Sequence, residues 1–359
     1  MSAPPDPGSV RTILVRANNW IGDVVLASPA LHALRLRFPG ARISILARPA
    51  VTPALDGSSD VDEIIPITPA ERHPGGFLRL TRALRVRRFD LAVLFQKAFE
   101  AALIARLSGA RRIYGYATDR RSWLLTDPIP ETAETRARHH ALVFLDLAAA
   151  AGADVSDRTL RFPLSETDRR GAAAALWTGG LREGEPFVAV HPGASKPPRA
   201  WHPERLGDAA RRLSLEIGGR VVAVGGPPDA SACSVAAGTG GVDLCGRTSV
   251  GQMAGVFEKA RLVIASDSGP MHVAAAVGAP VVGIFGPGRP EKTAPFVAES
   301  RYAAIGLRFP CSPCRQDFFN ECDPAPSGKP WCLEEIDVER VVAAARPLLV
   351  SGDGASPCA

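Results

Sequence analysis

The sequence lacks several patterns, and each absence excludes a class of protein. No apolar run approaches the roughly 18 residues that a membrane-spanning helix needs. The most apolar stretch, 273–285, is interrupted by two glycines and a proline. Residues 1–10 have neither the charged nor the apolar segment of a signal peptide, so we expect a flexible tail there. Together these absences predict a cytoplasmic protein.

Lysine and aromatic residues are also scarce. Only five of the 42 basic residues are Lys, and aromatic residues make up 6% of the chain. Residues 1–150 hold 20 Lys and Arg against 14 Asp and Glu, whereas the remainder holds 22 against 23. A basic half is typical of proteins that bind nucleic acid, anionic lipid or a phosphorylated substrate.

The most basic segment, 79–88, argues against nucleic acid. It contains five Arg but no aromatic residue between Phe77 and Phe89. A nucleic-acid surface would interleave aromatic side chains with its basic ones, for stacking on bases. We therefore interpret 79–88 as a solvated helix face and expect no nucleic-acid partner.

Cofactor fingerprints are missing as well. The first turns of both halves lack the G-x-G-x-x-G and P-loop patterns, which disfavours an NAD-dependent oxidoreductase. What is present is a chain of 359 residues with 46% hydrophobic and 22% charged residues, long enough for two globular domains.

Strands and helices alternate in both halves of the chain. The first half starts with a strand at 12–16, a polar turn, one helix over 24–38 and a strand at 42–47. The pattern restarts at Pro186 with a strand at 187–191. This alternation predicts an α/β fold with two doubly wound, Rossmann-like domains that face each other.

The expected domain boundaries follow from this pattern. We divide the chain into a flexible tail (1–10), a first domain (11–160), a linker region (161–182), a second domain (183–332), a last helix that could return to the first domain (333–350) and a terminal tail (351–359).

A polar turn in the second half is a candidate ligand site. Ser266, Asp267, Ser268 and Gly269 lie between the apolar strand 262–265 and a helix of small residues. In open α/β sheets ligands bind at such turns, because the free N–H groups and the helix dipole attract phosphate. The alternative is that Ser and Asp here only cap the helix.

The corresponding turn in the first half contains Asp23. This residue begins a helix directly after the first strand, in the cleft position of the expected sheet. A single carboxylate there is suited to take a proton from a hydroxyl group. The alternative is a helix-start Asp that only interacts with the dipole.

Cationic side chains in loops of the first domain are candidates for binding an anionic ligand. The charge difference between the halves leads us to select Lys97, Arg120, Arg121 and His139, which lie on loops expected at the mouth of this domain.

Four cysteines lie close together near the end of the chain. Cys311, Cys314, Cys322 and Cys332 form the pattern C-x2-C-x7-C-x9-C. The first pair has the spacing of zinc ligands, but the later gaps match no common zinc finger. The alternatives are a structural zinc site and free thiols in a surface loop.

An ordered set of motifs covers nearly the whole chain, from Thr12 to Leu349. These are ILVRANNWIGDVVLASPAL, HPGASKPPRAWHPERL, VGGPPD, GRTS and SDSGPMHVAAAVGAPVVGIFGP. The set resembles the ADP-heptose:lipopolysaccharide heptosyltransferases of glycosyltransferase family 9. The form of the first motif and the cysteine cluster are most similar to the heptosyltransferase II branch of that family.

The resemblance implies a GT-B fold, with the active site in the cleft between two Rossmann-like domains. It implies inverting transfer of heptose from ADP-L-glycero-D-manno-heptose, bound by the second domain, without a catalytic metal or other cofactor. The acceptor implied is the phosphorylated inner core of lipopolysaccharide in a Gram-negative bacterium, bound by the first domain at the cytosolic face of the inner membrane. A GT-B transferase or epimerase for another nucleotide sugar is the alternative.

The resemblance also assigns roles to residues. Asp23 matches the general base. The donor-binding positions that it implies are Ser195, Arg199, Asp229, Thr248, Asp267, Ser268, Gly269 and His272. Arg199 replaces a Lys of the family pattern, and Asp229 replaces a Glu, so both contacts differ in reach.

Overall fold

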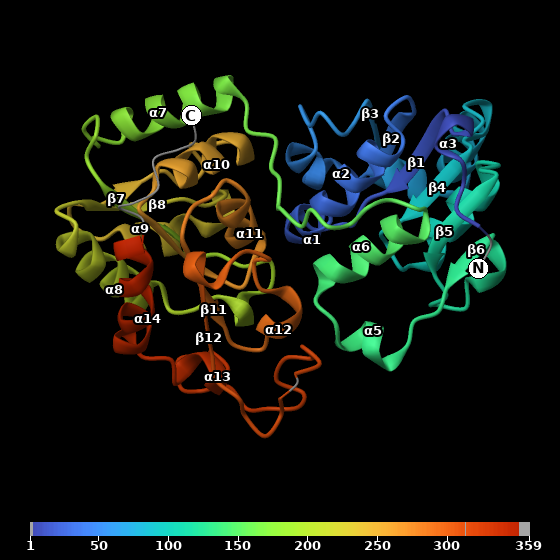
Figure 1. Cartoon of the computed structure of the whole chain (residues 1–359). Coiled ribbons are helices and arrows are strands. Elements are labelled where there is room, and N and C mark those ends of the chain that lie inside the picture. The colour runs from blue at the N-terminus through green and yellow to red at the C-terminus, as the bar shows by residue number, and fades with distance from the viewer. Residues whose placement is uncertain (1–2, 313, 352–359) are drawn as a thin grey trace. The chain divides into compact units, whose positions relative to one another are not determined.

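The computed structural model describes residues 3–312 and 314–351 of the chain (Figure 1). The chain separates between Pro163 and Leu164 into two compact units. Each unit is built around its own parallel six-stranded sheet with helices on both faces. The expected α/β class with two doubly wound domains is therefore confirmed.

The first unit alternates strands and helices along the chain. Its strands are β1 (Thr12–Arg16), β2 (Arg42–Ala47), β3 (Glu63–Pro66), β4 (Leu91–Leu94), β5 (Arg112–Tyr116) and β6 (Asp127–Ile129). Its helices are α1 (Ile21–Leu26), α2 (Ser28–Arg37), α3 (Pro74–Val86), α4 (Phe99–Leu107), α5 (Ala133–Ala137) and α6 (His140–Ala150). Short 3-10 turns lie at Pro7–Ser9, Pro49–Ala54, Pro69–Arg72 and Ser122–Leu124.

The strand order in this sheet is β3-β2-β1-β4-β5-β6. The order reverses between β1 and β4, whose register pairs Ile13 with Leu91 and Arg16 with Leu94. Helices α1, α2 and α6 pack together on one face, and α3 and α4 pack on the other. Because β1 and β4 are buried on both faces, they are continuous apolar runs, which made them recognisable in the sequence.

The helix expected over 24–38 is instead two helices. α1 ends at Leu26 and α2 begins at Ser28, with Ala27 between them. Pro29 stands in the first turn of α2, where its missing N–H costs nothing, but it cannot continue a helix that has already begun. The break keeps α1 short, and its first turn contains Asp23.

The second unit repeats the same architecture. Its strands are β7 (Phe187–His191), β8 (Arg220–Ala223), β9 (Val242–Asp243), β10 (Leu262–Ser266), β11 (Val281–Phe285) and β12 (Tyr302–Gly306). Its helices are α7 (Glu166–Thr178), α8 (Pro203–Glu216), α9 (Ala230–Ala237), α10 (Val250–Lys259), α11 (Gly269–Ala276), α12 (Pro290–Thr293), α13 (Trp331–Glu334) and α14 (Val338–Ser351). Short 3-10 turns lie at Pro197–Arg199, Pro227–Asp229 and Glu299–Arg301.

The second sheet has the order β12-β11-β10-β7-β8-β9, which reverses between β7 and β10. One face is covered by α8, α9 and α14, around a core that includes Val188, Trp201 and Ile264. α10 and α11 cover the opposite face. Both sheets therefore have a reversal point, which is where ligands bind in folds of this kind.

Two expected boundaries need correction. The segment 161–182, expected as a linker with a helix, contains the helix α7, but this helix packs along α10 and so belongs to the second unit (Figure 1). Gly171 and Gly255 make this packing possible, because a Cβ on either would contact the facing helix at 2.4 or 2.8 Å. The last helix, α14, packs on α8, β11 and β12 of the second unit, which is not the expected return to the first domain.

Part of the expected N-terminal tail packs against the first unit. Residues 3–10 do not extend freely, since the carbonyl oxygens of Ala3 and Pro5 accept hydrogen bonds from Arg112 and Arg37 and Val10 is buried. Residues 1–2 and 352–359 of the expected tails lie outside the described residues. Among the described helices, none is long and apolar enough to cross a membrane.

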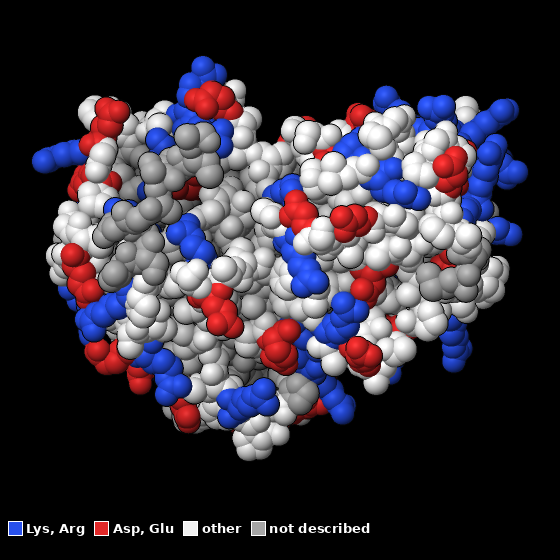
Figure 2. Space-filling model, viewed as in Figure 1, with Lys and Arg blue, Asp and Glu red and all other residues white. Residues whose placement is uncertain are grey.

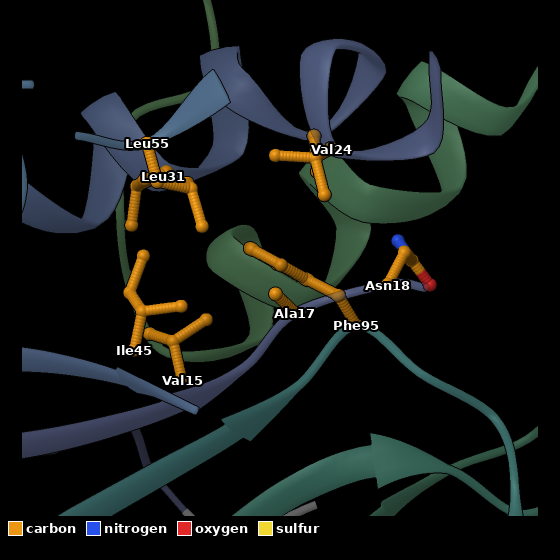
Figure 3. A pocket seen from close by; sticks show the side chains of 9 residues that line it. Val15, Ala17, Asn18, Val24, Leu31, Ile45, Leu55 and Phe95 are labelled. Carbon is orange, nitrogen blue, oxygen red and sulfur yellow. The ribbon is translucent and has the colours of Figure 1, made fainter. Parts of the chain in front are cut away.

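A small cavity lies beneath α1 in the first unit. Figure 3 shows apolar side chains from β1, β2, α1, α2 and the end of β4 pointing into it, among them Val15, Val24 and Phe95. Its volume of about 10 Å³ leaves room for one water molecule at most. We interpret it as a packing defect and not as a ligand site.

Candidate active site

In the second unit, the reversal point of the sheet brings two predicted turns together. β7 ends at His191 and β10 ends at Ser266, and these strands are neighbours. Ser268 Oγ lies 3.4 Å from His191 Nδ1 across this point. Burial lowers the pKa of His191, so its imidazole is neutral at pH 7 and pairs with the hydroxyl as a neutral group.

The N-cap residue of α11 does not cap this helix through its side chain. Ser268 occupies the N-cap position with an extended backbone, but its side chain makes no capping hydrogen bond. The interpretation that Ser and Asp merely cap this helix is therefore wrong for Ser268. The first-turn N–H groups of α11, beginning at Gly269, remain suited to bind an anion together with the helix dipole.

Arg199 and Asp267 form an ion pair beside this helix start. Arg199 Nη2 lies 2.5 Å from Asp267 Oδ2, and the Asp267 side chain is 3% exposed. The pair holds the guanidinium in place next to the turn and balances the buried carboxylate. Gly288 is required here, because a Cβ at this position would lie 2.1 Å from the Asp267 carboxylate oxygen.

The other predicted donor-binding residues lie on the same unit. Ser195 is exposed on the loop after β7, and Thr248 is partly buried on the loop before α10. His272 is buried on α11. The Asp229 carboxylate accepts a hydrogen bond of 3.0 Å from the Gly226 N–H, so it stabilises its own turn.

In the first unit, Asp23 lies in the first turn of α1, after β1. Its carboxylate is 29% exposed, and Oδ1 lies 3.6 Å from Nδ1 of His140. His140 begins α6 and its ring packs edge-on against Phe144. The sequence led us to predict His139 as a site residue but not His140, although the two are adjacent. The available signal was the His pair at the start of a helix.

The four cationic candidates in this unit differ in what they contact. Lys97 Nζ lies 2.6 Å from Glu131 and 4.8 Å above the Tyr116 ring centre. Arg120 is exposed, with a positive φ of 52°. His139 is the N-cap of α6 and accepts a hydrogen bond from the Ala141 N–H.

Arg121 requires a correction. It is fully buried, and its guanidinium donates hydrogen bonds to the carbonyl oxygens of Tyr116, Gln96 and Ala98 at 3.0, 2.7 and 2.9 Å. Burial lowers its pKa to about 10, which still leaves it charged at pH 7. A buried guanidinium on carbonyl groups does not contact a ligand phosphate, so Arg121 acts by fixing the two loops.

The basic helix α3 is a solvated face, as expected. Leu80 and Leu84 are buried against the sheet, whereas Arg79, Arg82, Arg85, Arg87 and Arg88 are exposed. Figure 2 shows basic side chains crowded over the region where Figure 1 labels α3. This group lies on the helix layer, away from the residues around Asp23.

Cys311, Cys314 and Cys322 lie on an irregular segment, and Cys332 lies in the short helix α13. Arg315 and Glu321 form an ion pair of 3.5 Å next to Cys314 and Cys322. An antiparallel bridge between Pro324 and Pro330 connects the chain near Cys322 with that near Cys332. Burial, and then the other three cysteines, raise the pKa of Cys332 to about 12.

A second group of ligand-type atoms was not predicted. The sulfur atoms of Cys233 and Cys245 and a carboxylate oxygen of Asp243 lie within 4.8 Å of one another. Burial raises the pKa of both thiols, and Cys245 Sγ donates a hydrogen bond to the Gly226 carbonyl. Because the group offers only three ligand atoms and Cys233 is part of the apolar core of the second unit, we interpret it as packing.

Comparisons with known proteins agree with this geometry. The model of glycosyltransferase family 9 (heptosyltransferase) matches residues 77–321. Lipopolysaccharide heptosyltransferase 2 of Escherichia coli K12 is 26% identical over 303 residues, which are 80% of this chain and 86% of that protein. The Salmonella typhimurium LT2 protein of the same name is 27% identical over 306 residues, with the same coverage.

Solved structures share the whole architecture. The structure of E. coli ADP-heptose lps heptosyltransferase II has a TM-score of 0.76 at 25% identity, over 96% of this chain and 100% of that one. A family 9 glycosyltransferase of Veillonella parvula has a TM-score of 0.82 at 21% identity, over 98% and 99% of the two chains. The expected GT-B fold is thus confirmed. Because its family model covers more than half of the sequence, the chain belongs to glycosyltransferase family 9, the heptosyltransferases, and is a glycosyltransferase.

Proposed function

We propose that this enzyme transfers heptose, with inversion, from ADP-L-glycero-D-manno-heptose to the phosphorylated inner core of lipopolysaccharide. The observation that most supports the proposal is the start of α11, where Ser268 makes no capping hydrogen bond, beside the Arg199–Asp267 pair. That arrangement suits a nucleotide diphosphate, and it lies at the sheet edge where nucleotides bind in Rossmann-like units.

The second unit supplies the donor site in this proposal. The diphosphate contacts the N–H groups at Gly269 and the Arg199 guanidinium, which stabilise the negative charge that develops as the sugar leaves. Ser268 and His272 lie next to this position, and Ser195 adds a hydroxyl from the loop after β7. Thr248 and the turn of Asp229 contact the nucleoside. No metal ion is needed for these contacts.

The first unit supplies the base. Asp23 accepts the proton of the acceptor hydroxyl as that oxygen attacks the anomeric carbon and the carbon–diphosphate bond breaks. The charged carboxylate is stabilised at the helix start, so we expect proton transfer late in the reaction. His140, 3.6 Å away, is positioned to orient the carboxylate.

Replacing the base tests this assignment. Asp23→Asn keeps the shape of the side chain but removes its basicity, so kcat should fall about 100-fold or more. ADP affinity, measured by calorimetry, should be unchanged, because the donor site lies on the other unit. Asp56→Asn, at an exposed carboxylate of the same unit, is the matched control. Retained turnover in Asp23→Asn would exclude Asp23 as the base.

The acceptor phosphates are assigned to Lys97, Arg120 and His139, with Arg121 holding the loops in place. Since the acceptor is lipid-anchored, we also propose that the enzyme works as a peripheral protein at the cytosolic face of the inner membrane. Flotation with anionic vesicles tests this. Binding that decreases with salt supports it, and no binding at low salt contradicts it.

A donor panel separates heptose transfer from the alternative of another nucleotide sugar. With purified enzyme and a truncated lipopolysaccharide, ADP release should be fastest from ADP-heptose. Faster turnover of a different nucleotide sugar, or epimerisation without transfer, would replace the proposed donor.

We further propose that Cys311, Cys314, Cys322 and Cys332 bind a structural zinc ion. Four thiols suit tetrahedral zinc, and Cys311 and Cys314 have the C-x2-C spacing of zinc ligands. Elemental analysis of the full-length protein should find one zinc per chain. Cys322→Ser should lose it, whereas Cys233→Ser, in the separate group, should retain it. A metal-free protein, or iron in place of zinc, would contradict the proposal.

A further inference from the structure

Exposed aromatic side chains of the first unit gather at one edge of its sheet. In the described part of this unit they are Trp20, Phe99 and Trp123, which are 61%, 36% and 71% exposed. They follow β1, β4 and β5, which are adjacent in the sheet. All three therefore lie at the carboxyl edge of the strands, where Asp23 also lies, although the chain separates them by up to about 100 residues.

Phe99 and Trp123 form a pair. Their ring centres are 6.4 Å apart and their planes are inclined by 51°. This is within the usual range for interacting aromatic rings, but most of the Trp123 ring still faces solvent. Exposure of a large aromatic side chain costs hydrophobic free energy, so a ring held in this way calls for an explanation.

Buried polar contacts fix the two loops that present the pair. Arg121 connects the carbonyl groups of Gln96 and Ala98, on the loop after β4, with that of Tyr116 at the end of β5. Thr118 Oγ1 donates to the Lys97 carbonyl at 3.1 Å, and Asp119 accepts the Phe99 N–H at 2.6 Å. The two loops are thus hydrogen-bonded to each other at several points close to the pair.

The loop between β5 and Trp123 has a strained backbone. Asp119 and Arg120 have φ values of 51° and 52°, in the left-handed region that costs a residue with a side chain free energy. Strained residues of this kind persist where the surrounding contacts enforce them, and they concentrate at ligand-binding loops. Here the buried Arg121 guanidinium provides that enforcement.

We propose that Phe99 and Trp123 form a stacking platform for a sugar ring of the acceptor, with Arg121 as its positioning residue. This inference rests on the proposed function. The C–H groups on one face of a pyranose are weakly positive and pack against the negative face of an aromatic ring. The neighbouring Asp119, Arg120 and Glu100 supply acceptors and a donor for the hydroxyl groups at the edge of the sugar.

The charges around the pair favour a carbohydrate over a membrane surface. Asp119 and Glu100 are carboxylates within one residue or a few residues of the rings, together with one exposed Arg. An anionic lipid surface would repel the carboxylates, whereas a sugar hydrogen-bonds to groups of both signs. The apolar area of two rings is also too small to dock the protein on a membrane.

Acceptor kinetics of Trp123→Ala test the platform. The acceptor is the oligosaccharide released by de-acylation of a truncated lipopolysaccharide, so no lipid contact contributes. We expect its KM to rise roughly tenfold or more, as for loss of a stacking contact, with kcat and ADP affinity nearly unchanged. Trp123→Phe should recover part of the affinity. Trp177→Phe, at a 69% exposed Trp on α7, is the control.

Arg121→Lys tests the positioning role. Lys retains the charge but cannot bridge three carbonyl groups, so the acceptor KM should rise while kcat for saturating acceptor is retained. A purely structural role would lower kcat and the thermal stability of the first unit together.

Three outcomes would overturn the inference. One is an unchanged acceptor KM in Trp123→Ala. Another is an effect confined to lipid-embedded acceptor, which would assign the rings to membrane contact. If the wild-type enzyme does not transfer heptose, the proposed function is wrong, but the platform can still be tested by calorimetric binding of the oligosaccharide. Weaker binding by Trp123→Ala would support the platform, and equal binding would contradict it.

Discussion

Arg199 and Asp267 illustrate how single residues prepare the donor site. Alone, Asp267 would repel a diphosphate, but its charge is balanced by the Arg199 guanidinium 2.5 Å away. The Arg199 side chain is 21% exposed, so part of it can contact a ligand while Nη2 pairs with Asp267. The pair thus fixes the guanidinium geometry before the nucleotide binds.

Removal of this guanidinium should weaken nucleotide binding. We expect Arg199→Ala to cost about 1–3 kcal/mol of ADP affinity, as for a charge-assisted hydrogen bond, measured by calorimetry. Arg199→Lys should recover only part, since an ammonium group does not reproduce the fork. The control is Arg211→Ala, at an exposed position of α8. Equal ADP affinity in Arg199→Ala would remove this residue from the donor site.

Residue roles were the least predictable part of the site. Asp23 and the turn at 266–269 could be predicted, because polar residues directly after apolar strands reach the carboxyl edge of a parallel sheet. The burial of Arg121 could not, since it depends on carbonyl groups from two loops 20 residues apart. The approach of His140 to Asp23 is likewise a product of the tertiary fold.

At the level of elements, some turns require glycine because a side chain there would collide with neighbouring residues. Gly288 follows β11, and a Cβ there would lie 2.1 Å from an Asp267 carboxylate oxygen and 2.9 Å from the Phe285 ring. Gly75, in the first turn of α3, has no neighbour within 4 Å and no positive φ. These two positions allow a matched comparison.

Substitution of the two glycines should have opposite effects. Gly288→Ala should lower the free energy of unfolding by about 1–3 kcal/mol, because rigid neighbours must move, and should also weaken ADP binding. Gly75→Ala should be neutral or stabilise by about 0.5–1 kcal/mol, through lower backbone entropy of the unfolded chain. Urea denaturation measures both. A neutral Gly288→Ala would contradict the packing around Asp267.

The segment before α14 is anchored by Glu334. Its carboxylate pairs with His202 at 2.9 Å and Arg205 at 3.0 Å, and a hydrogen bond from Ser327, followed by these neighbours, holds the pKa of Glu334 below its ordinary value of 4.5. A lowered pKa in the folded state contributes stability above the unfolded value, and this contribution is lost as the pH falls below it.

This anchor predicts a pH-dependent difference between wild type and Glu334→Gln. The urea midpoint of the wild type should be higher at neutral pH, and the difference should shrink as the pH falls below about 4.5, where the carboxylate becomes protonated. A difference that is independent of pH below 4.5 would show that the charge of Glu334 does not contribute.

Secondary structure was predictable where strands are buried and mostly apolar, as for β1, β7 and β10. Edge strands are partly exposed and short, so β6 and β12 gave no clear apolar run. The break at Ala27 was missed because the apolar period continues through it, although Pro29 was a visible signal. α7 was missed as part of the second unit because its packing on α10 depends on glycines in both helices.

On the scale of the whole molecule, the two units divide the chemistry. The proposed base and acceptor-binding residues lie in residues 3–163, and all proposed donor-binding residues lie between Leu164 and Ser351. The sequence hinted at this division through its uneven charge, since the excess of basic over acidic residues is confined to residues 1–150. It could not indicate that α7 and α14 both belong to the second unit.

Because the two units are separate, we expect nucleotide to change the thermal unfolding of only one of them. In calorimetric unfolding we expect two transitions, with ADP raising only that of the second unit. At 100 times its Kd, ADP should add about 2.7 kcal/mol, or roughly 5–10 °C for a unit of this size. The Gly288→Ala variant identifies the second-unit transition by its lower midpoint. A shift of the other transition alone would contradict the assignment of the donor site.

The most direct test of heptose transfer is the mass of the product formed from ADP-heptose and a truncated lipopolysaccharide. The purified enzyme should add one heptose residue to the acceptor and release ADP, and Asp23→Asn should leave the acceptor mass unchanged over the same time. An acceptor that gains no heptose from the wild-type enzyme, or gains it equally from Asp23→Asn, would contradict the proposed reaction or its base.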